Sequence, residues 1–314
     1  MSTVAESRAV GPLPARWKQG IVGELWAEFF GCFILISFGD GVVAMLWALI
    51  GSGRTDNPAT ALLGGGDWLL ITFGWAMAVT FAIYTVGGVT GAHINPAITL
   101  GAAIRKQLPW NKVAPYWVVQ VAGAFVGAAL VFLVYNNAIN HYDQVHGIVK
   151  GHANSLPTYS TFATFPAPYF HNVAGPVVDE IVGTFFLALF VFAVTDELNL
   201  APSSNLGPLI VGFIVLAVGI SFGANSGYAI NPARDFGPRL FAWIAGWGKV
   251  AMPGDYGWIN TYFWVPIVAP LIGASLAVPA YDIGIRKILI ARKAAAEESE
   301  GGRVPGPPPE TLET

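Results

Sequence analysis

The chain has 314 residues, of which 54% are hydrophobic and 11% are charged, and its mean hydropathy is +0.56. Charged residues make up about a quarter of an ordinary soluble domain, so the composition excludes that class and indicates an integral membrane protein. The formal net charge of −3 identifies no partner, and we expect no nucleic-acid ligand. The single cysteine, Cys32, excludes an internal disulfide and is expected to pack inside the first apolar stretch.

Six apolar stretches approach or exceed the length of about 20 residues that a helix needs to cross a bilayer. The predicted spans are 21–50, 68–90, 113–136, 177–198, 206–224 and 260–286. Residues 137–176 are expected to form one long outside loop and a solvated vestibule wall. The histidines of this loop are irregularly spaced and have no cysteine nearby, so no metal site is predicted there.

Two Asn-Pro-Ala triplets follow the second and fifth spans, at Asn95-Pro96-Ala97 and at Asn231-Pro232-Ala233. Asn is a strong N-cap residue and Pro is favoured at the first helical position, so each triplet predicts the start of a helix. Each helix has only a half-length apolar stretch, which predicts a re-entrant half-helix lining a cavity.

The two triplets also predict a specific chemistry. Each Asn oxygen would accept a hydrogen bond from its own helix, leaving its NH₂ group pointing outward as a pair of donors. Two helix starts that face each other would place four side-chain donors and two positive dipole ends at one point. Such a point suits a hydroxyl or water oxygen and repels a cation. A third triplet, Asn57-Pro58-Ala59, lies in a polar stretch and is interpreted as a loop turn.

An internal repeat is visible before the triplets. Both 28–35 and 180–187 read Glu-x-x-Gly-x-Phe-x-Leu. Each half has an odd number of spans, so the repeats, roughly 21–136 and 177–290, are predicted to be inverted in the membrane. Binding sites in such folds lie at the repeat interface near the midplane.

Three carboxylates are predicted at membrane depth, where an ionisable group is a functional candidate by default. Glu28 and Glu180 occupy matching positions in the two halves. Either they carry protons in a coupled transporter, or each anchors the exposed backbone of its re-entrant segment, which we favour. Asp40 has no counterpart in the second half, and the sequence leaves open whether it caps a helix break or lines the bundle interior.

Basic residues orient the chain, because cytoplasmic loops carry an excess of Lys and Arg. Six spans put both termini on one side, with eleven basic residues there and three opposite. The first group is Arg8, Arg16, Lys18, Arg105, Lys106, Lys112, Arg286, Lys287, Arg292, Lys293 and Arg303, and the second is Arg54, Lys150 and Lys249. We therefore expect cytoplasmic termini and, without a targeting signal, a bacterial inner membrane. Residues 1–20 and 291–314 are expected to be cytoplasmic tails, the latter disordered.

The triplets, their flanking glycines and the repeated glutamates resemble the aquaporin (major intrinsic protein) family over residues 21–290. The run from Asn231 to Arg239 is similar to the glycerol-conducting branch, the aquaglyceroporins, in which an Asp, here Asp235, follows the filter arginine. The resemblance implies a homotetramer with one pore per subunit and a buttressing role for Glu28 and Glu180. It also implies a selectivity filter of Trp75, Gly219, Tyr228 and Arg234.

The chemistry of that filter can be read from its residue types. Arg234 offers five donors in a fixed fork and a permanent positive charge. Trp75 and Tyr228 would form an apolar corner for a carbon backbone, although packing in the core or against lipid is the alternative. Gly219 replaces the histidine usual in water-selective members, which removes bulk and a donor. His93 is expected to hold the re-entrant backbone so that the carbonyls of residues 91–94 face the pore.

These observations predict an all-α membrane protein with six transmembrane helices and two re-entrant half-helices. The predicted function is a passive channel for glycerol and other small neutral solutes, with water, excluding ions and protons. The alternatives are a proton-coupled carrier, a water-selective channel, and a junction protein with a closed pore. The sequence contains no nucleophile–base pair, metal cluster or phosphate loop, so neither an enzyme nor a cofactor is expected.

Overall fold

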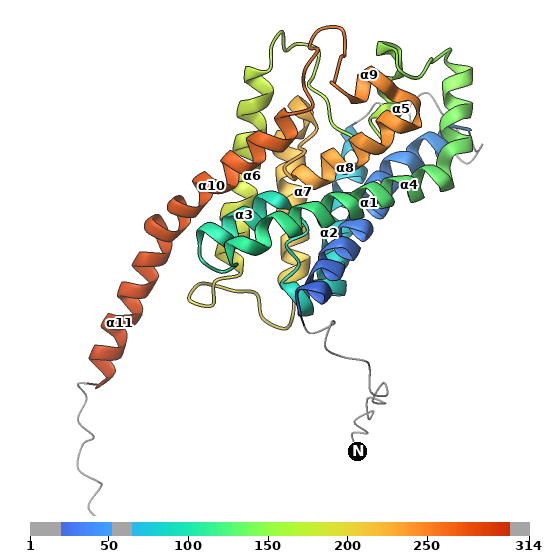
Figure 1. Ribbon diagram of the computed structural model, residues 1–314. Helices are drawn as coiled ribbons and strands as arrows, with labels where there is room; N and C mark the ends of the chain where they lie inside the picture. Colours follow the sequence, from blue (N-terminus) through green and yellow to red (C-terminus); the bar gives the residue numbers. More distant parts are fainter. Residues whose placement is uncertain (1–19, 52–64, 302–314) are drawn as a thin grey trace, which may run out of the picture.

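A computed structural model describes residues 20–51 and 65–301 (Figure 1). Helices make up the regular structure of these residues, and no strand occurs among them. The third Asn-Pro-Ala triplet, at 57–59, lies outside the described residues, as do nearly all of the expected N-terminal tail and the last 13 residues, 302–314.

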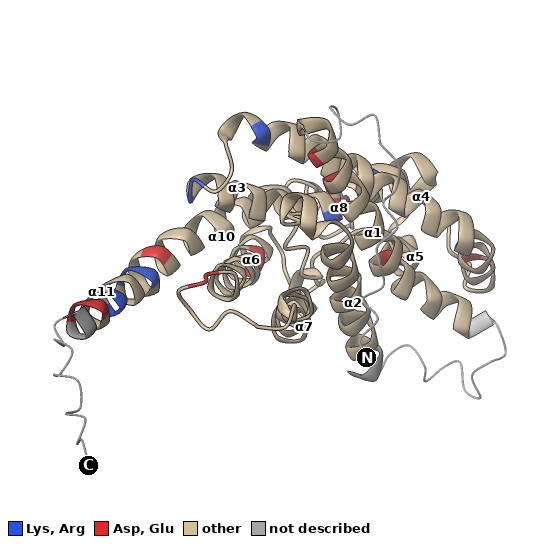
Figure 2. Ribbon diagram, turned by 90° about the horizontal axis from the view of Figure 1, so that it is seen from below, with Lys and Arg blue, Asp and Glu red and all other residues tan. Residues whose placement is uncertain are grey.

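Six long helices form the body of the molecule, and each is long and apolar enough to cross a membrane, the sixth together with its helical continuation to Glu298. They are α1 (Ile21–Gly51), α2 (Gly65–Thr90), α4 (Val113–Val145), α6 (Ala174–Val194), α7 (Gly207–Ser226) and α10 (Val265–Tyr281). The helices of the bundle carry few charged residues along their length (Figure 2). The six predicted spans are therefore present, with the third extending further and the sixth beginning later than the sequence indicated.

Two short helices begin at the Asn-Pro-Ala triplets, and both lie in the middle of the bundle (Figure 1). They are α3 (Pro96–Ile104) and α8 (Pro232–Ala242), of 9 and 11 residues. At 1.5 Å per residue neither exceeds about 17 Å, roughly half the hydrocarbon thickness of a bilayer. Each is therefore a half-helix.

The packing repeats between the halves. In the first half α1 packs on α2 and α4, and in the second α6 packs on α7 and α10. The α2–α7 contact joins the halves, and each half-helix packs on the last long helix of the opposite half, α3 on α10 and α8 on α4. The chain thus forms two interlocked repeats, and both half-helices lie at their interface.

Close helix contacts use glycines at equivalent places. A Cβ on Gly123 or Gly127 of α4 would collide with the backbone carbonyl of Phe29 or Phe33 on α1. Gly273 of α10 lies in the same way against the backbone of α6 at Ile181. The Gly123-x₃-Gly127 spacing therefore serves packing within the chain.

Residues 137–176 differ from the predicted solvated loop. The α4 helix continues to Val145, and it is followed by two short helices, η2 (Ala153–Ser155) and α5 (Leu156–Tyr159). Tyr159, Phe162 and Thr164 are buried. The prediction was wrong because this segment is rich in aromatic and small residues that pack on α8 and its C-terminal extension. That extension consists of η3 (Trp243–Trp247) and α9 (Gly248–Ala251).

The prediction that the chain is disordered from residue 291 onward is wrong for residues 291–301. A π-helical segment, η4 (Asp282–Arg286), joins α10 to α11 (Lys287–Gly301), which extends away from the bundle (Figure 1). Residues 291–301 are therefore helical. Four consecutive good helix formers, Lys293 to Ala296, explain why a charged, exposed segment continues the helix. The remaining short helix, η1 (Trp110–Lys112), precedes α4.

Candidate functional site: a cavity at the repeat interface

Both half-helices begin with the predicted asparagine cap. The Oδ1 atom of Asn95 accepts a hydrogen bond from the N–H of Ala97 at 2.8 Å. The Oδ1 atom of Asn231 accepts from Ala233 at 3.0 Å and from Arg234 at 3.2 Å. In both caps the Asn backbone is extended and Pro occupies the first turn. The side chains are therefore oriented by their own helices.

The amide nitrogens of the two asparagines bond across the repeat interface. The Nδ2 atom of Asn95 donates to the carbonyl of Ile230 at 2.9 Å, and Nδ2 of Asn231 donates to the carbonyl of Ile94 at 2.9 Å. The expectation of four free side-chain donors was therefore wrong. Since an NH₂ group has two N–H bonds, each asparagine retains one for a solute.

Glu28 of α1 holds the backbone that precedes α3. Its Oε1 accepts from the N–H of His93 at 2.9 Å, and its Oε2 accepts from Ile94 at 2.7 Å. Thr90 and Gln120 donate to the same carboxylate. With its oxygens bonded in this way, Glu28 is fully buried.

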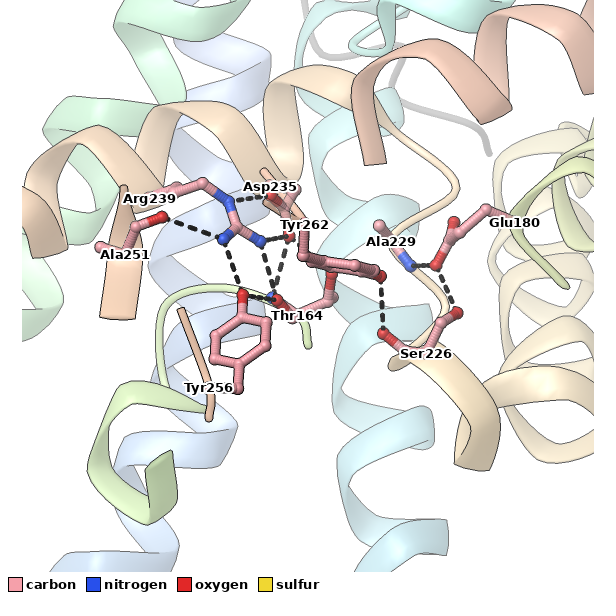
Figure 3. Close-up of polar contacts among 9 residues, drawn as sticks. All are labelled: Thr164, Glu180, Ser226, Ala229, Asp235, Arg239, Ala251, Tyr256 and Tyr262. Carbon is pink, nitrogen blue, oxygen red and sulfur yellow. Dashed lines mark hydrogen bonds and ion pairs between the residues drawn. The ribbon is translucent and has the colours of Figure 1, made fainter. Parts of the chain in front are cut away.

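Glu180 of α6 makes the equivalent contacts in the second half. Its two oxygens accept from the N–H groups of Ala229 and Ile230, both at 2.8 Å. Ser226 Oγ also donates to it at 2.7 Å, and Figure 3 shows the contacts with Ala229 and Ser226. Each glutamate thus binds the backbone N–H groups of the two residues that immediately precede an Asn cap.

The bonded segments have a strained backbone that recurs in both halves. The φ angle is +54° at Ala92 and +43° at Ile94, and +41° at Tyr228 and +45° at Ile230. Residues other than Gly rarely adopt positive φ, and such conformations cost of order 1–3 kcal/mol each. The glutamate bonds and the cross-interface asparagine bonds hold this conformation, which the sequence did not predict.

His93 lies between α3 and α4. Its Nδ1 lies 3.2 Å from the Oγ1 of Thr99, and its ring packs on Tyr116 at 5.6 Å between centroids. Its backbone N–H is bound by Glu28. The imidazole therefore contacts the half-helix and the neighbouring span, which is the position expected for a residue that supports the re-entrant backbone.

A cavity of about 400 Å³ lies where the two halves meet. Both re-entrant segments line it, including 91–95 and 228–231. The rest of the lining is mainly aliphatic and aromatic, with Leu35, Val79, Ile83, Leu187, Val191, Phe192, Val211 and Val215. The lining therefore combines polar backbone and Asn groups with a larger set of apolar side chains.

Three of the four predicted filter residues line this cavity: Trp75, Tyr228 and Arg234. The guanidinium carbon of Arg234 lies 4.0 Å from the centroid of the Trp75 ring, a cation–π arrangement. Within the described part of the chain the Arg234 side chain has no hydrogen-bond or ion-pair partner. Its donors are thus available to a molecule in the cavity.

Gly219 lies behind Tyr228. A Cβ on Gly219 would stand 2.9 Å from Cε2 of the tyrosine ring and 2.8 Å from Thr72, and a Cβ on Gly223 would stand 2.7 Å from the same ring. Trp68 contacts the Tyr228 ring edge-on, and its Nε1 donates to the carbonyl of Gly219 at 3.0 Å. Two glycines one helical turn apart thus form the seat for the ring. The sequence analysis missed Gly223, although the Gly-x₃-Gly spacing was visible.

Asp235 pairs with Arg239 and not with its neighbour Arg234. The Arg239 Nε lies 2.7 Å from Asp235 Oδ1 and Nη2 lies 3.1 Å from Oδ2, and both side chains are fully buried. Asp235 also accepts from the N–H and Oγ1 of Thr164, at 2.8 and 2.7 Å. The pair therefore joins α8 to the segment after α5 (Figure 3).

Arg239 extends the same network. It donates to the carbonyls of Thr164 at 2.7 Å and Ala251 at 3.1 Å, and to the hydroxyl of Tyr256 at 3.0 Å. Burial raises the pKa of Tyr256, so its hydroxyl stays protonated. The sequence analysis missed Arg239, Thr164 and Tyr256, although the i, i+4 spacing of Asp235 and Arg239 was a usable signal.

The fold and the site together define an α-helical membrane protein with a cavity, lined by polar and apolar groups, at the interface of two inverted repeats. The family model of the major intrinsic protein matches residues 16–281. The chain belongs to the major intrinsic protein family.

Relatives and a solved structure resemble the chain over most of its length. It is 40% identical to the propanediol uptake facilitator PduF of Citrobacter freundii over 283 residues, which cover 90% of this chain and 99% of that protein. It is 38% identical to the glycerol uptake facilitator protein of Escherichia coli K12, covering 88% and 93%. The X-ray structure of the aquaglyceroporin from Plasmodium falciparum has a TM-score of 0.72 at 31% identity, covering 87% of this chain and all of that one.

Proposed function

We propose that this protein is a passive channel for glycerol and similar small neutral solutes, together with water. The observation that carries the proposal is the mixed lining of the cavity, in which Arg234 and two asparagines occur together with many apolar side chains. A linear polyol has hydroxyls and C–H groups along its length. Its hydroxyls can bond to the polar groups of the lining while its carbon backbone contacts the apolar side chains. Relatives named as glycerol and propanediol facilitators support this solute class.

The same geometry favours exclusion of cations and protons. Asn95 and Asn231 cap two helix N-termini, whose dipoles present partial positive charge. Arg234 adds a full positive charge beside the cavity. A water molecule bound to the free N–H of each asparagine would have a fixed orientation, which interrupts a hydrogen-bonded file along which protons could hop.

The proton-coupled carrier is the alternative from a different class. It needs a carboxylate that can gain and lose a proton as the solute moves. Glu28 and Glu180 each bind two backbone N–H groups, so protonation of either would release a strained segment. Their bonding favours a structural role, and we propose that they buttress the re-entrant segments together with His93.

Four further properties belong to the proposal. Residues 21–290 form the channel domain, and both termini lie on the cytoplasmic side of a plasma membrane. The start of α1 and the end of α10 lie on the same side of the bundle, in agreement with this topology (Figure 1). We also propose a homotetramer with one pore per subunit, and Gly219 with Tyr228 as the elements that favour polyols over water alone.

Stopped-flow light scattering on proteoliposomes tests the proposal. We expect glycerol, 1,2-propanediol and water to enter faster than in empty liposomes, with solute flux unchanged when a proton gradient is collapsed. A pH gradient should persist while glycerol flows. Flux that stops with the gradient would support the carrier, water flux without glycerol flux would support a water-selective channel, and the absence of both would indicate a closed pore.

A further inference from the structure

Phe192 of α6 belongs to the cavity lining, and its ring packs on the half-helix α3. A Cβ on Gly101 would stand 2.7 Å from the Cζ atom of Phe192, so the tip of the ring fills the space that this glycine leaves. Gly101 follows the Asn95 cap by six residues, which is about 9 Å along the helix axis. Phe192 therefore forms part of the cavity wall near the C-terminal end of α3, away from the Asn caps.

The guanidinium of Arg105, the residue directly after α3, covers this ring. Its carbon lies 4.6 Å from the centroid of the Phe192 ring and 5.4 Å from that of Tyr281. The side chain of Arg105 is only 5% exposed, and Arg105 is not among the described residues that line the cavity. It therefore contacts Phe192 from behind the cavity wall.

Asp282, at the start of η4, fixes the guanidinium in this place. The Nε atom of Arg105 lies 3.1 and 3.2 Å from the two carboxylate oxygens, and Nη2 lies 3.0 Å from Oδ1. A planar guanidinium can bind a carboxylate with its edge while its face stacks on an aromatic ring. The ion pair thus holds Arg105, and Arg105 in turn limits where the Phe192 ring can move.

We propose that Arg105 is a positioning residue of the channel, which fixes the Phe192 ring and thereby the width of the cavity near the C-terminal end of α3. Gln107 and Thr195 also line the cavity there. Arg234 and the two asparagines offer hydrogen bonds to hydroxyls, whereas the Phe192 ring offers none and restricts the cross-section of the solute. This inference rests on the proposed channel function.

Solute flux in proteoliposomes tests the proposal with two probes that have the same number of hydroxyls, linear erythritol and branched pentaerythritol. Arg105→Ala leaves space behind the Phe192 ring, so the ring can move back from the cavity. We expect the ratio of pentaerythritol to erythritol flux to rise by about tenfold, the lower end of the effect of one methylene group in a fitted site. Glycerol and water fluxes should stay close to those of the wild type.

Two further variants test whether Arg105 acts through the ring. Phe192→Leu should raise the same ratio by itself, and Arg105→Ala/Phe192→Leu should show no further rise, because contacting residues are non-additive in a double-mutant cycle. Arg105→Lys keeps a positive charge for Asp282 but lacks the planar group that stacks on the ring. Its ratio should lie between those of the wild type and Arg105→Ala.

Arg286→Ala is the matched control. Arg286 also lies in η4, and it pairs with Asp196 at 3.1 Å, which is not among the described lining residues. This variant loses an ion pair of the same type at the same end of the bundle. Its ratio of pentaerythritol to erythritol flux should equal that of the wild type.

The proposal is overturned by an unchanged ratio in assembled Arg105→Ala, by an equal rise in Arg286→Ala, or by additive effects in the double variant. An equal loss of flux for every solute would show that Arg105 only supports the fold. If Arg105→Ala does not assemble, Arg105→Lys carries the test, and its ratio must exceed that of the wild type. Wild-type protein that carries no glycerol would refute the proposed function itself, whereas normal wild-type flux with an unchanged ratio in the variant would refute only the role of Arg105.

Discussion

Arg234 and Trp75 come from opposite halves of the chain, and the guanidinium carbon lies over the indole ring, 4.0 Å from its centroid. The arginine lies in the first turn of α8, and the tryptophan lies on α2. The aromatic face orients a charged group that has no other side-chain partner in the described residues. It leaves the donors along the edge of the guanidinium free, and it provides an apolar surface beside them.

We predict that Arg234→Val leaves the protein folded and assembled but loosens selectivity. The side chain contributes no hydrogen bond to the described fold, so little stability should be lost. On the solute side, two charge-assisted bonds of about 1.5–3 kcal/mol each are lost and partly replaced by water. Small cations should begin to leak while water passes. Size-exclusion profiles and conductance on one preparation measure both effects.

Arg234→Lys is the matched control for that experiment. Lysine keeps the positive charge but lacks the planar fork that can bind two hydroxyls. Cation exclusion should persist and glycerol flux should fall. An intact Arg234→Val oligomer with unchanged cation exclusion would contradict the assignment of Arg234 to the filter, and a misfolded one would indicate a structural role.

We predict that Gly219→Ala reduces glycerol flux more than water flux. The new Cβ would stand 2.9 Å from the Tyr228 ring, so the ring must move away from α7 and toward the cavity that it lines. Glycerol flux should fall by about tenfold, which is the lower end of the effect of one methylene group in a fitted site. Gly219→His should have a larger effect in the same direction.

Gly88→Ala on α2 is the control, because a Cβ at that position meets no atom within 4 Å. Its glycerol and water fluxes should match those of the wild type. Equal losses of glycerol and water flux in Gly219→Ala would show that Tyr228 is not at the constriction. Unchanged fluxes in both variants would show that the ring can move without narrowing the pathway.

The sequence predicted the features that depend on local chemistry. Asn95 and Asn231 cap their helices because the cap bond closes within three residues, so its residue types are sufficient to identify it. The membrane spans follow from hydropathy, and the family membership follows from motifs that are contiguous in the chain. The positions of Glu28 and Glu180 were also visible as a repeat.

The features that the sequence did not predict depend on contacts between distant segments. The second asparagine donor is directed at a carbonyl of the opposite half, which no local pattern specifies. Gly219 was expected to line the pore, but the space it leaves is filled by Tyr228. Burial of the segment around Thr164 depends on Arg239, which binds its carbonyl from 75 residues further along the chain.

We predict that Glu180→Gln lowers stability and solute flux together. Glutamine replaces one acceptor oxygen with an NH₂ group that faces a backbone N–H, at Ala229 or Ile230. An unsatisfied buried donor costs about 1–3 kcal/mol. Glu28→Gln should behave in the same way. Glu197→Gln, at an exposed position, should change neither quantity.

Thermal denaturation in detergent and glycerol flux in proteoliposomes measure these effects. The buttress interpretation requires both to fall in Glu180→Gln and Glu28→Gln. A variant of unchanged stability whose flux no longer responds to a proton gradient, beside a wild type that does respond, would instead identify the glutamate as a proton carrier.

The Asp235–Arg239 pair should be among the most sensitive positions for stability. Removing one partner of a buried ion pair leaves an uncompensated charge and costs about 3–5 kcal/mol. We therefore predict that Asp235→Ala lowers the midpoint of thermal denaturation strongly. Because Asp235 directly follows Arg234, loosening of α8 should also reduce the selectivity of the channel.

The exposed pair of Lys249 and Asp255 provides the control. Its atoms lie 3.2 Å apart, and the lysine side chain is 62% exposed. Such surface pairs contribute about 0–1 kcal/mol to stability, so the midpoint of thermal denaturation of Lys249→Ala should stay close to that of the wild type.

A double variant, Asp235→Ala/Arg239→Met, separates the effect of charge from the effect of packing. If the stranded guanidinium causes the loss, the double variant should be more stable than Asp235→Ala, because it buries no unpaired charge. If it is less stable, the bonds of Arg239 to Thr164, Ala251 and Tyr256 hold α8 in place independently of Asp235.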